Sequence, residues 1–285
     1  MLANLNDVLR PAMRGRYAIG LFNAVNVEMA RGIIEAAEAL RAPVIVGTAE
    51  VLLPIMPLEA VADYLVPMAK RASVPVVLHF DHGLRHETCV RALDLGFTSV
   101  MYDCSTDSYD ENLRRVKDMA AIAHARGATI EGELGHVGDN EGSAEGDSHI
   151  TDPAAFYTDP AQAVDFTRRT SVDALAIAVG SAHGAYKLPP KLDFARIRAI
   201  AEATNLPLVL HGGSGLSASD FRTAVEKGIC KINIFTDINV AAVEGMQAAL
   251  PSAAHGITDL IPAQIAAVRR VTEDKMQLFG SNGKA

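Results

Sequence analysis

The sequence has little cysteine, few basic residues for its length and no long uninterrupted apolar run. Its three cysteines, Cys89, Cys104 and Cys230, are odd in number, far apart and outside any C-x-x-C pattern. A disulfide framework is therefore not expected, and three small buried thiols in a reducing cytoplasm are the simpler interpretation.

Basic residues are outnumbered by acidic ones. The chain has 26 Lys and Arg against 34 Asp and Glu, which gives a net charge of −8 and a pI near 5.6. Nucleic acids and anionic membranes are bound by clustered Lys and Arg, so neither is expected as a partner. The balance is compatible with a small phosphorylated ligand.

No segment has the pattern of a membrane span or a signal peptide. The most apolar stretch, residues 42–69, is interrupted by Glu50, Glu59, Asp63 and several prolines, which a membrane-spanning helix does not tolerate easily. Residues 1–16 lack the apolar core of a secretory signal. We therefore expect a soluble, cytoplasmic protein.

Short β-branched runs alternate with helical stretches along nearly the whole chain, which is the pattern of a parallel sheet built through crossover helices. The predicted strands are 17–22, 43–48, 75–80, 99–103, 129–134, 174–179, 206–210 and 231–234. Eight strand–helix units in 285 residues favour an α/β fold of the (β/α)8 TIM-barrel type, with an open doubly wound sheet as the alternative. No linker or change of composition divides the chain, so residues 1–285 are predicted to form a single domain.

One segment interrupts the alternation. Residues 135–159 combine four glycines, Gly135, Gly138, Gly142 and Gly146, with acidic residues and serines. Such a segment cannot bury apolar surface, so it is predicted to be a mobile loop, either a functional lid or a disordered excursion.

Three histidines, each followed by glycine, stand where predicted strands end: His82, His183 and His211. The carboxyl ends of barrel strands meet at one face, and three imidazoles with one open position define a catalytic zinc site. The alternative is that each is an ordinary satisfied polar residue. Asp81 precedes His82, and neighbours on an extended strand point to opposite sides, so both reach one pocket only where the strand gives way to loop. There Asp81 either shuttles a proton or orients a histidine.

Two further strand ends favour phosphate binding. A glycine-rich turn, residues 212–215, precedes a helix expected to start near Ser217, and Asn233 to Asp237 follow the last strand. Backbone N–H groups at such helix starts bind anions, and barrel phosphate sites often combine the loops after strands seven and eight. Otherwise the two segments are an ordinary turn and a helix cap.

The ordered motifs resemble the class II, zinc-dependent ketose-bisphosphate aldolases from end to end. They are His79-Phe80-Asp81-His82, Glu131-Gly132-Glu133-Leu134-Gly135, Gly180-Ser181-Ala182-His183-Gly184, Leu210-His211-Gly212-Gly213-Ser214-Gly215 and Lys231-Ile232-Asn233, with Phe22-Asn23 early and residues 279–283 at the end. The resemblance implies a (β/α)8 barrel that reversibly cleaves a ketose 1,6-bisphosphate, fructose 1,6-bisphosphate first, to dihydroxyacetone phosphate and an aldehyde.

The resemblance also implies a role for each residue that matches a family motif. The resemblance implies that Zn2+ is held by His82, His183 and His211, with Glu133 and Asp103 as further metal-contacting acids. It makes Asp81 the group that exchanges a proton with the C4 oxygen, and Glu141 the group that moves a proton at C3. The implied substrate-binding residues are Asn23, Gly184, Gly212, Gly213, Ser214, Asn233 and Thr236. It also implies a monovalent cation, Na+ or K+, and a homodimer or homotetramer.

Departures from the family pattern leave the substrate open. Ala49 stands where relatives often have serine, and Ile265 aligns roughly with an arginine that holds the distal phosphate. Because guanidinium groups bind phosphate in a bidentate way, tagatose 1,6-bisphosphate or a ketose bearing one phosphate are alternatives. A non-catalytic partner subunit of a related aldolase and a metal-dependent sugar-phosphate isomerase or epimerase are two further alternatives.

Overall fold

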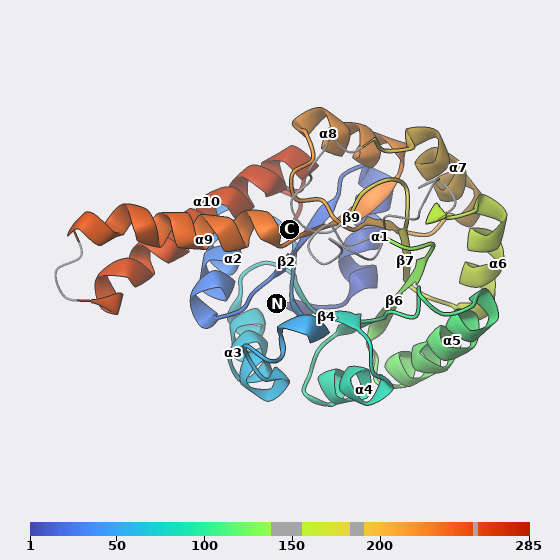
Figure 1. Ribbon diagram of the computed structural model, residues 1–285, viewed down its shortest axis with the longest axis horizontal. Helices are drawn as coiled ribbons and strands as arrows, with labels where there is room; N and C mark the ends of the chain where they lie inside the picture. The colour runs from blue at the N-terminus through green and yellow to red at the C-terminus, as the bar shows by residue number, and fades with distance from the viewer. Residues whose placement is uncertain (138–155, 183–190, 253–255) are drawn as a thin grey trace, which may run out of the picture.

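The computed structural model describes residues 1–137, 156–182, 191–252 and 256–285. Eight parallel strands form a barrel, surrounded by helices and closed by the pairing of β4 with β5 (Figure 1). These strands are β2 (Ile19–Asn23), β3 (Val44–Ala49), β4 (Val76–Gly83), β5 (Ser99–Tyr102), β6 (Thr129–Leu134), β7 (Ala174–Ile177), β8 (Leu208–Leu210) and β9 (Ile229–Ile234). The predicted (β/α)8 barrel is confirmed, and each predicted strand is present with small shifts at its ends.

The helices follow the strands along the chain. They are α1 (Leu5–Gly15), α2 (Val27–Leu40), α3 (Leu58–Arg71), α4 (His86–Asp94), α5 (Tyr109–Ala125), α6 (Pro160–Thr170), α7 (Phe194–Thr204), α8 (Ala218–Lys227), α9 (Thr236–Ala249) and α10 (Ile257–Phe279), with short 3-10 turns η1 (Glu50–Leu52) and η3 (Leu250–Ser252). Figure 1 shows α9 and α10 side by side, extending beyond the barrel. Within the described residues, no helix is both long and apolar enough to cross a membrane.

The strands separate two apolar layers because successive side chains on a strand point to opposite faces. On β4, Val76, Leu78 and Phe80 belong to the layer shared with the outer helices. Val77 belongs to a second layer inside the barrel, and the same alternation points His79 and Asp81 inward. The inward positions of β4 therefore change from apolar to polar along the strand.

Helix α1 closes the amino-terminal end of the barrel. Its buried residues Leu5 and Leu9 share the inner apolar layer with Ile45, Val77 and Val209 from the strands. An additional strand, β1 (Leu2–Ala3), pairs with the start of β4; it was not predicted, since two residues carry no periodic pattern. The carboxyl-terminal half of the interior is therefore left for polar side chains.

Asp81 and His82 are neighbours on β4, and a β-bulge near the end of this strand allows both side chains to face the barrel mouth. Phe80 pairs with Val100 and Gly83 with Tyr102, so β4 uses one more residue than β5 over this interval. His82 takes up the extra residue with a left-handed φ of 43°. A bulge re-aims side chains at a strand end, which is how adjacent residues both face the barrel mouth.

The segment expected to be a mobile loop, 135–159, falls largely outside the described residues, because 138–155 are not among them. Its mobility stays a prediction. The predicted start of α8 is confirmed: Ser217 caps the helix, and its hydroxyl accepts a hydrogen bond from the Asp220 backbone N–H at 3.1 Å. The three cysteines are buried, as expected.

The bulge depends on glycine at position 83. A Cβ at Gly83 would lie 2.3 Å from Cys89 Sγ and 2.9 Å from the Met101 carbonyl oxygen. Gly83→Ala is therefore expected to lower the free energy of unfolding by about 1–3 kcal/mol, measured from urea denaturation. Because Cys89→Ala removes the nearest atom, the double variant should lose less than the sum of the single losses. Strict additivity would contradict this packing account.

Candidate active site

Asp81 lies at the centre of the polar half of the barrel and is 2% exposed. Asn23 Nδ2 donates to one carboxylate oxygen at 2.8 Å, and Asn233 Nδ2 lies 3.1 and 3.2 Å from the two oxygens. Burial alone would raise the pKa of Asp81, but the charge of His82 and the nearby His79 hold it well below its usual range. Asp81 is thus a carboxylate held in a fixed orientation by two amides.

His82 is held in place by Asp103, which follows β5. The Nδ1 atom of His82 lies 2.8 Å from Asp103 Oδ2, and the Ser105 backbone N–H donates to the other carboxylate oxygen at 3.1 Å. Burial opposes the charged imidazole, yet the carboxylates of Asp81 and Asp103 raise the pKa of His82. Because Nδ1 is directed at Asp103, Nε2 is the nitrogen suited to a metal.

His211 follows β8 and lies between two carboxylates. Its Nε2 is 2.9 Å from Glu131 Oε1, and its Nδ1 is 3.1 Å from Glu133 Oε2. Burial favours the neutral ring, but these two carboxylates raise the pKa of His211 to about 10. The rings of His82 and His211 have centroids 4.6 Å apart, so two imidazoles from distant strands share one site.

The donor set fits a divalent metal ion. One ligand atom each from Asp81, His82 and His211 lies within 4.8 Å of the others, and His82, Asp103 and Glu133 form a second such group. Imidazole nitrogens and carboxylate oxygens are the ligands of catalytic zinc and related ions. A cation between these groups would offset the buried negative charge of the carboxylates.

Three buried residues beneath this group were not among the predicted site residues: His79, Glu131 and Lys231. Glu131 Oε2 lies 2.8 Å from Lys231 Nζ, and both side chains are fully buried. Burial would raise the pKa of Glu131, but Lys231 and His211 lower it to about 2. Glu131 stands two residues before Glu133, and Lys231 two before Asn233, so the two-residue period of a strand was the signal that could have found them.

The loops after β8 and β9 meet beside Asp81, because Asn233 at the end of β9 contacts both Asp81 and the loop after β8. Gly212 has a φ of 64°, and a Cβ there would lie 2.2 Å from the Ala182 carbonyl oxygen, so only glycine fits. The Gly213 backbone N–H donates to the Asn233 carbonyl at 3.3 Å, and the Asp237 N–H donates to Ser214 Oγ at 3.4 Å. The two predicted phosphate segments are thus adjacent.

Thr236 is the first residue of α9 and lines a hollow of about 440 Å3 formed with residues of α10.

The predicted residues Glu141, His183 and Gly184 lie outside the described part of the chain, so their roles stay predictions.

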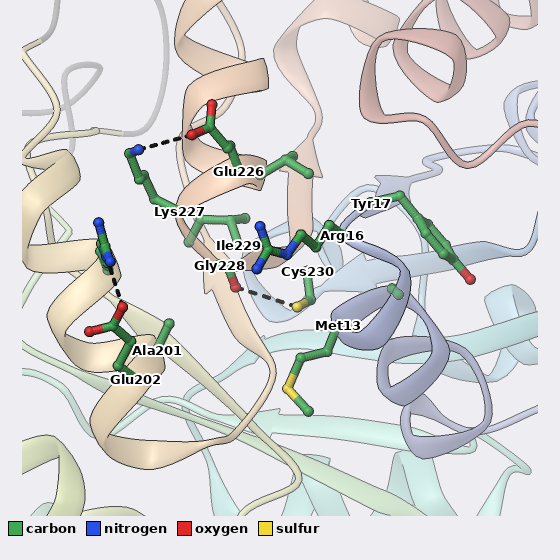
Figure 2. Close-up of a pocket in the computed structure, with 13 residues that line it drawn as sticks. Met13, Arg16, Tyr17, Ala201, Glu202, Glu226, Lys227, Gly228, Ile229 and Cys230 are labelled. Atoms are coloured by element: carbon green, nitrogen blue, oxygen red, sulfur yellow. Dashed lines mark hydrogen bonds and ion pairs between the residues drawn. The ribbon is translucent and has the colours of Figure 1, made fainter.

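A second hollow, of about 330 Å3, opens at the other end of the barrel between α1, α7, α8 and β9 (Figure 2). Its charges are largely paired within its own rim: Lys227 lies 3.0 Å from Glu226, and Arg198 2.7 Å from Glu202. Burial raises the pKa of the Cys230 thiol to about 11, which leaves it unreactive. Because barrel enzymes react at the carboxyl-terminal face, this hollow is not the active site.

Comparison with known proteins agrees with this geometry. The family model described as fructose-bisphosphate aldolase class-II matches residues 3–284. A fructose-bisphosphate aldolase from Geobacillus stearothermophilus is 38% identical, over 100% of this chain and 99% of the relative. The crystal structure of the YdjI aldolase from Escherichia coli K12 superposes with a TM-score of 0.89 at 36% identity, covering 100% of both chains.

The fold and the polar barrel mouth therefore define a class II aldolase, a lyase of a metal-dependent class that acts on sugar phosphates. The chain belongs to the class II fructose-bisphosphate aldolase family.

The hydrogen bond from His82 to Asp103 can be tested by mutation. Asp103→Ala should weaken the binding of a divalent ion such as Zn2+ or Co2+ by about 10–100-fold, because His82 loses the partner that fixes its ring. The measurement is competition against a chelator of known affinity. Asp107→Ala is the control, since Asp107 lies in the same loop and pairs with Arg115. Wild-type affinity in the Asp103 variant, or equal losses in both, would contradict the role.

Proposed function

We propose that this protein is a Zn2+-dependent class II aldolase that reversibly cleaves a ketose 1,6-bisphosphate to dihydroxyacetone phosphate and an aldehyde. Fructose 1,6-bisphosphate is the first candidate. The observation that supports this best is the grouping of Asp81, His82 and His211, whose ligand atoms lie within 4.8 Å of one another at the barrel mouth. The grouping supports the proposal because an ionised carboxylate next to imidazoles that could hold a metal is the arrangement that retro-aldol cleavage requires.

His82, His183 and His211 would hold Zn2+, with Glu133 as an additional acid. Asp103 touches His82 through a hydrogen bond, so we assign it to orienting that ring. When bound, the ion supplies Lewis-acid stabilisation of the negative charge that develops on the substrate oxygens.

Asp81 moves the proton at the C4 oxygen. In the cleavage direction its carboxylate takes the proton of the C4 hydroxyl while the C3–C4 bond breaks, and in condensation it returns the proton. Asn23 and Asn233 hold its two oxygens, so little reorganisation is needed at the moment of transfer.

Glu141 is proposed to protonate C3 of the three-carbon fragment, on the basis of the family resemblance. It belongs to segment 135–159, and closure of that segment over the mouth would bring the acid to the substrate and exclude water. The conversion of the fragment to dihydroxyacetone phosphate then needs no solvent proton.

The substrate phosphate is proposed to bind where the loops after β8 and β9 meet. Their backbone N–H groups and the Ser214 hydroxyl are the donors that a phosphate needs at a helix start. The proposed contacts are Gly184, Gly212, Gly213, Ser214 and Thr236, with Na+ or K+ nearby.

Fewer residues are available to select the distal group of the substrate than to bind the phosphate on C1. Ile265 is buried and apolar, so it offers no charge to a distal phosphate. A relative from Alkalicoccus urumqiensis, 36% identical over 98% of this chain and 96% of its own length, is a sulfofructosephosphate aldolase. A ketose 1-phosphate with a different distal group is therefore the second candidate, and tagatose 1,6-bisphosphate is a stereochemical variant of the first.

The oligomeric state and the cellular compartment are proposed from the same family resemblance. We propose a homodimer or homotetramer in the cytoplasm, where the three buried thiols stay reduced.

Removal of the metal tests the proposed function directly. Treatment with a chelator should abolish cleavage of a panel of ketose phosphates, and added Zn2+ should restore it, with dihydroxyacetone phosphate detected by a coupled reductase. The reverse reaction, dihydroxyacetone phosphate with a panel of aldehydes, identifies the ketose. Activity that survives metal removal would rule out the mechanism. Rearranged ketose without triose phosphate would indicate an isomerase or epimerase, and inert protein that activates a homologue would indicate a partner subunit.

Asp81→Ala separates catalysis from metal binding. Turnover should fall by about 10²–10⁴-fold, because the proton at the C4 oxygen loses its acceptor, while zinc content measured by atomic absorption stays near the wild-type value. Loss of zinc from this variant would instead make Asp81 a metal ligand.

A further inference from the structure

We infer that Glu131 and Lys231 are positioning residues, and that the ion pair between them holds Asp81 and His211 together as one rigid unit. The inference rests on the proposed function and deepens it, because it assigns a role to two residues that touch neither substrate nor metal.

The pair is wholly enclosed by the barrel. Glu131 on β6 and Lys231 on β9 are 0% exposed, and Lys231 Nζ lies 2.8 Å from Glu131 Oε2. Taking two charges out of water is costly, and apolar side chains of similar size often stabilise a fold as well or better. The apolar layer around α1 already fills the barrel below them, so packing alone does not account for the pair.

One arm of the pair reaches Asp81. Lys231 Nζ donates to Asn233 Oδ1 at 2.8 Å. An ammonium group can only donate, so it fixes the amide with its oxygen toward Lys231 and its NH2 toward Asp81. Asn233 Nδ2 then lies 3.1 Å from Asp81 Oδ1, and the orientation of Asp81 depends on Lys231 through this amide.

The other arm reaches His211. Glu131 Oε1 is 2.9 Å from His211 Nε2, and a carboxylate can only accept, so Nε2 carries the hydrogen. Nδ1, which lies 3.1 Å from Glu133 Oε2, is left to ligate the ion. Glu131 thereby fixes both the ring orientation and the ligating nitrogen of His211.

A buried carboxylate at the opposite end of the barrel provides a contrast. Asp173, just before β7, accepts hydrogen bonds from the Ile130 backbone N–H and from His124 Nε2, both at 2.9 Å. The first bond joins Asp173 to β6 and the second joins it to α5, so neither involves a residue of the site. Asp173→Asn is therefore a matched control, which should lower stability without changing metal binding.

The wild-type protein supplies the first test. Long-range 1H–15N spectra of the zinc-loaded enzyme should show His211 protonated at Nε2 and ligated through Nδ1. Ligation through Nε2 overturns the inference, because Glu131 could not then hold that nitrogen.

The variant test uses Lys231→Met/Glu131→Gln, which removes both charges with little change of shape and leaves no buried charge unpaired. We expect about 10–100-fold weaker Zn2+ binding, an altered Co2+ absorption spectrum, and a lower kcat with a smaller change in KM. Glu131→Gln alone should show the same changes in binding and spectrum. If neither variant folds, the 1H–15N measurement on the wild-type protein decides the matter.

The outcomes separate this inference from the proposed function. Wild-type protein that binds no zinc and cleaves no ketose phosphate would defeat the proposed function itself. Wild-type protein that does both, with folded variants that keep wild-type zinc affinity and Co2+ spectrum, would overturn only the positioning role. Equal losses in the Asp173→Asn control would also overturn it, by showing that any buried polar change produces them.

Discussion

The site depends on mutual compensation of charges inside the barrel. Glu131, Lys231, Asp81 and His211 are almost completely buried, where a charge without a partner is very costly. Each therefore stands within hydrogen-bond distance of a neighbour from another strand. Removing one of these groups therefore leaves a buried neighbour without one of its partners.

The two ends of the barrel interior have different side chains and different roles. The amino-terminal half of the interior is apolar and closed by α1, so it supplies stability, while the carboxyl-terminal half carries carboxylates, amides and imidazoles. Rigid strands hold Asn23 and Asn233 at hydrogen-bond distances of 2.8–3.2 Å from Asp81. The bulge at His82 is the one departure from regular strand geometry at this end of β4, and it adds a second functional side chain at the end of that strand.

The sequence allowed the fold to be predicted because eight apolar runs alternate with amphipathic segments. It also predicted Asp81, His82 and His211 as site residues, since reactive groups on a barrel lie at the carboxyl ends of strands, and the structure brings these three side chains together. It did not reveal that a bulge within β4, and not the end of the strand, turns His82 inward, because a bulge depends on strand pairing and not on local residue type. Glu131 and Lys231 were not predicted as site residues, because a charged residue within a strand usually points to solvent. Here both side chains are buried and form an ion pair with each other. Glu141 rests on the family resemblance alone, whereas His183 was also predicted from its place at the end of a strand.

Imidazoles from separate strands are predicted to hold one divalent ion at the barrel mouth. Zinc X-ray absorption spectroscopy of the loaded protein tests this prediction most directly. The account predicts nitrogen and oxygen neighbours at about 2.0–2.1 Å, with the outer-shell scattering of three imidazole rings. A sulfur neighbour at about 2.3 Å, or a spectrum without imidazole scattering, would contradict it.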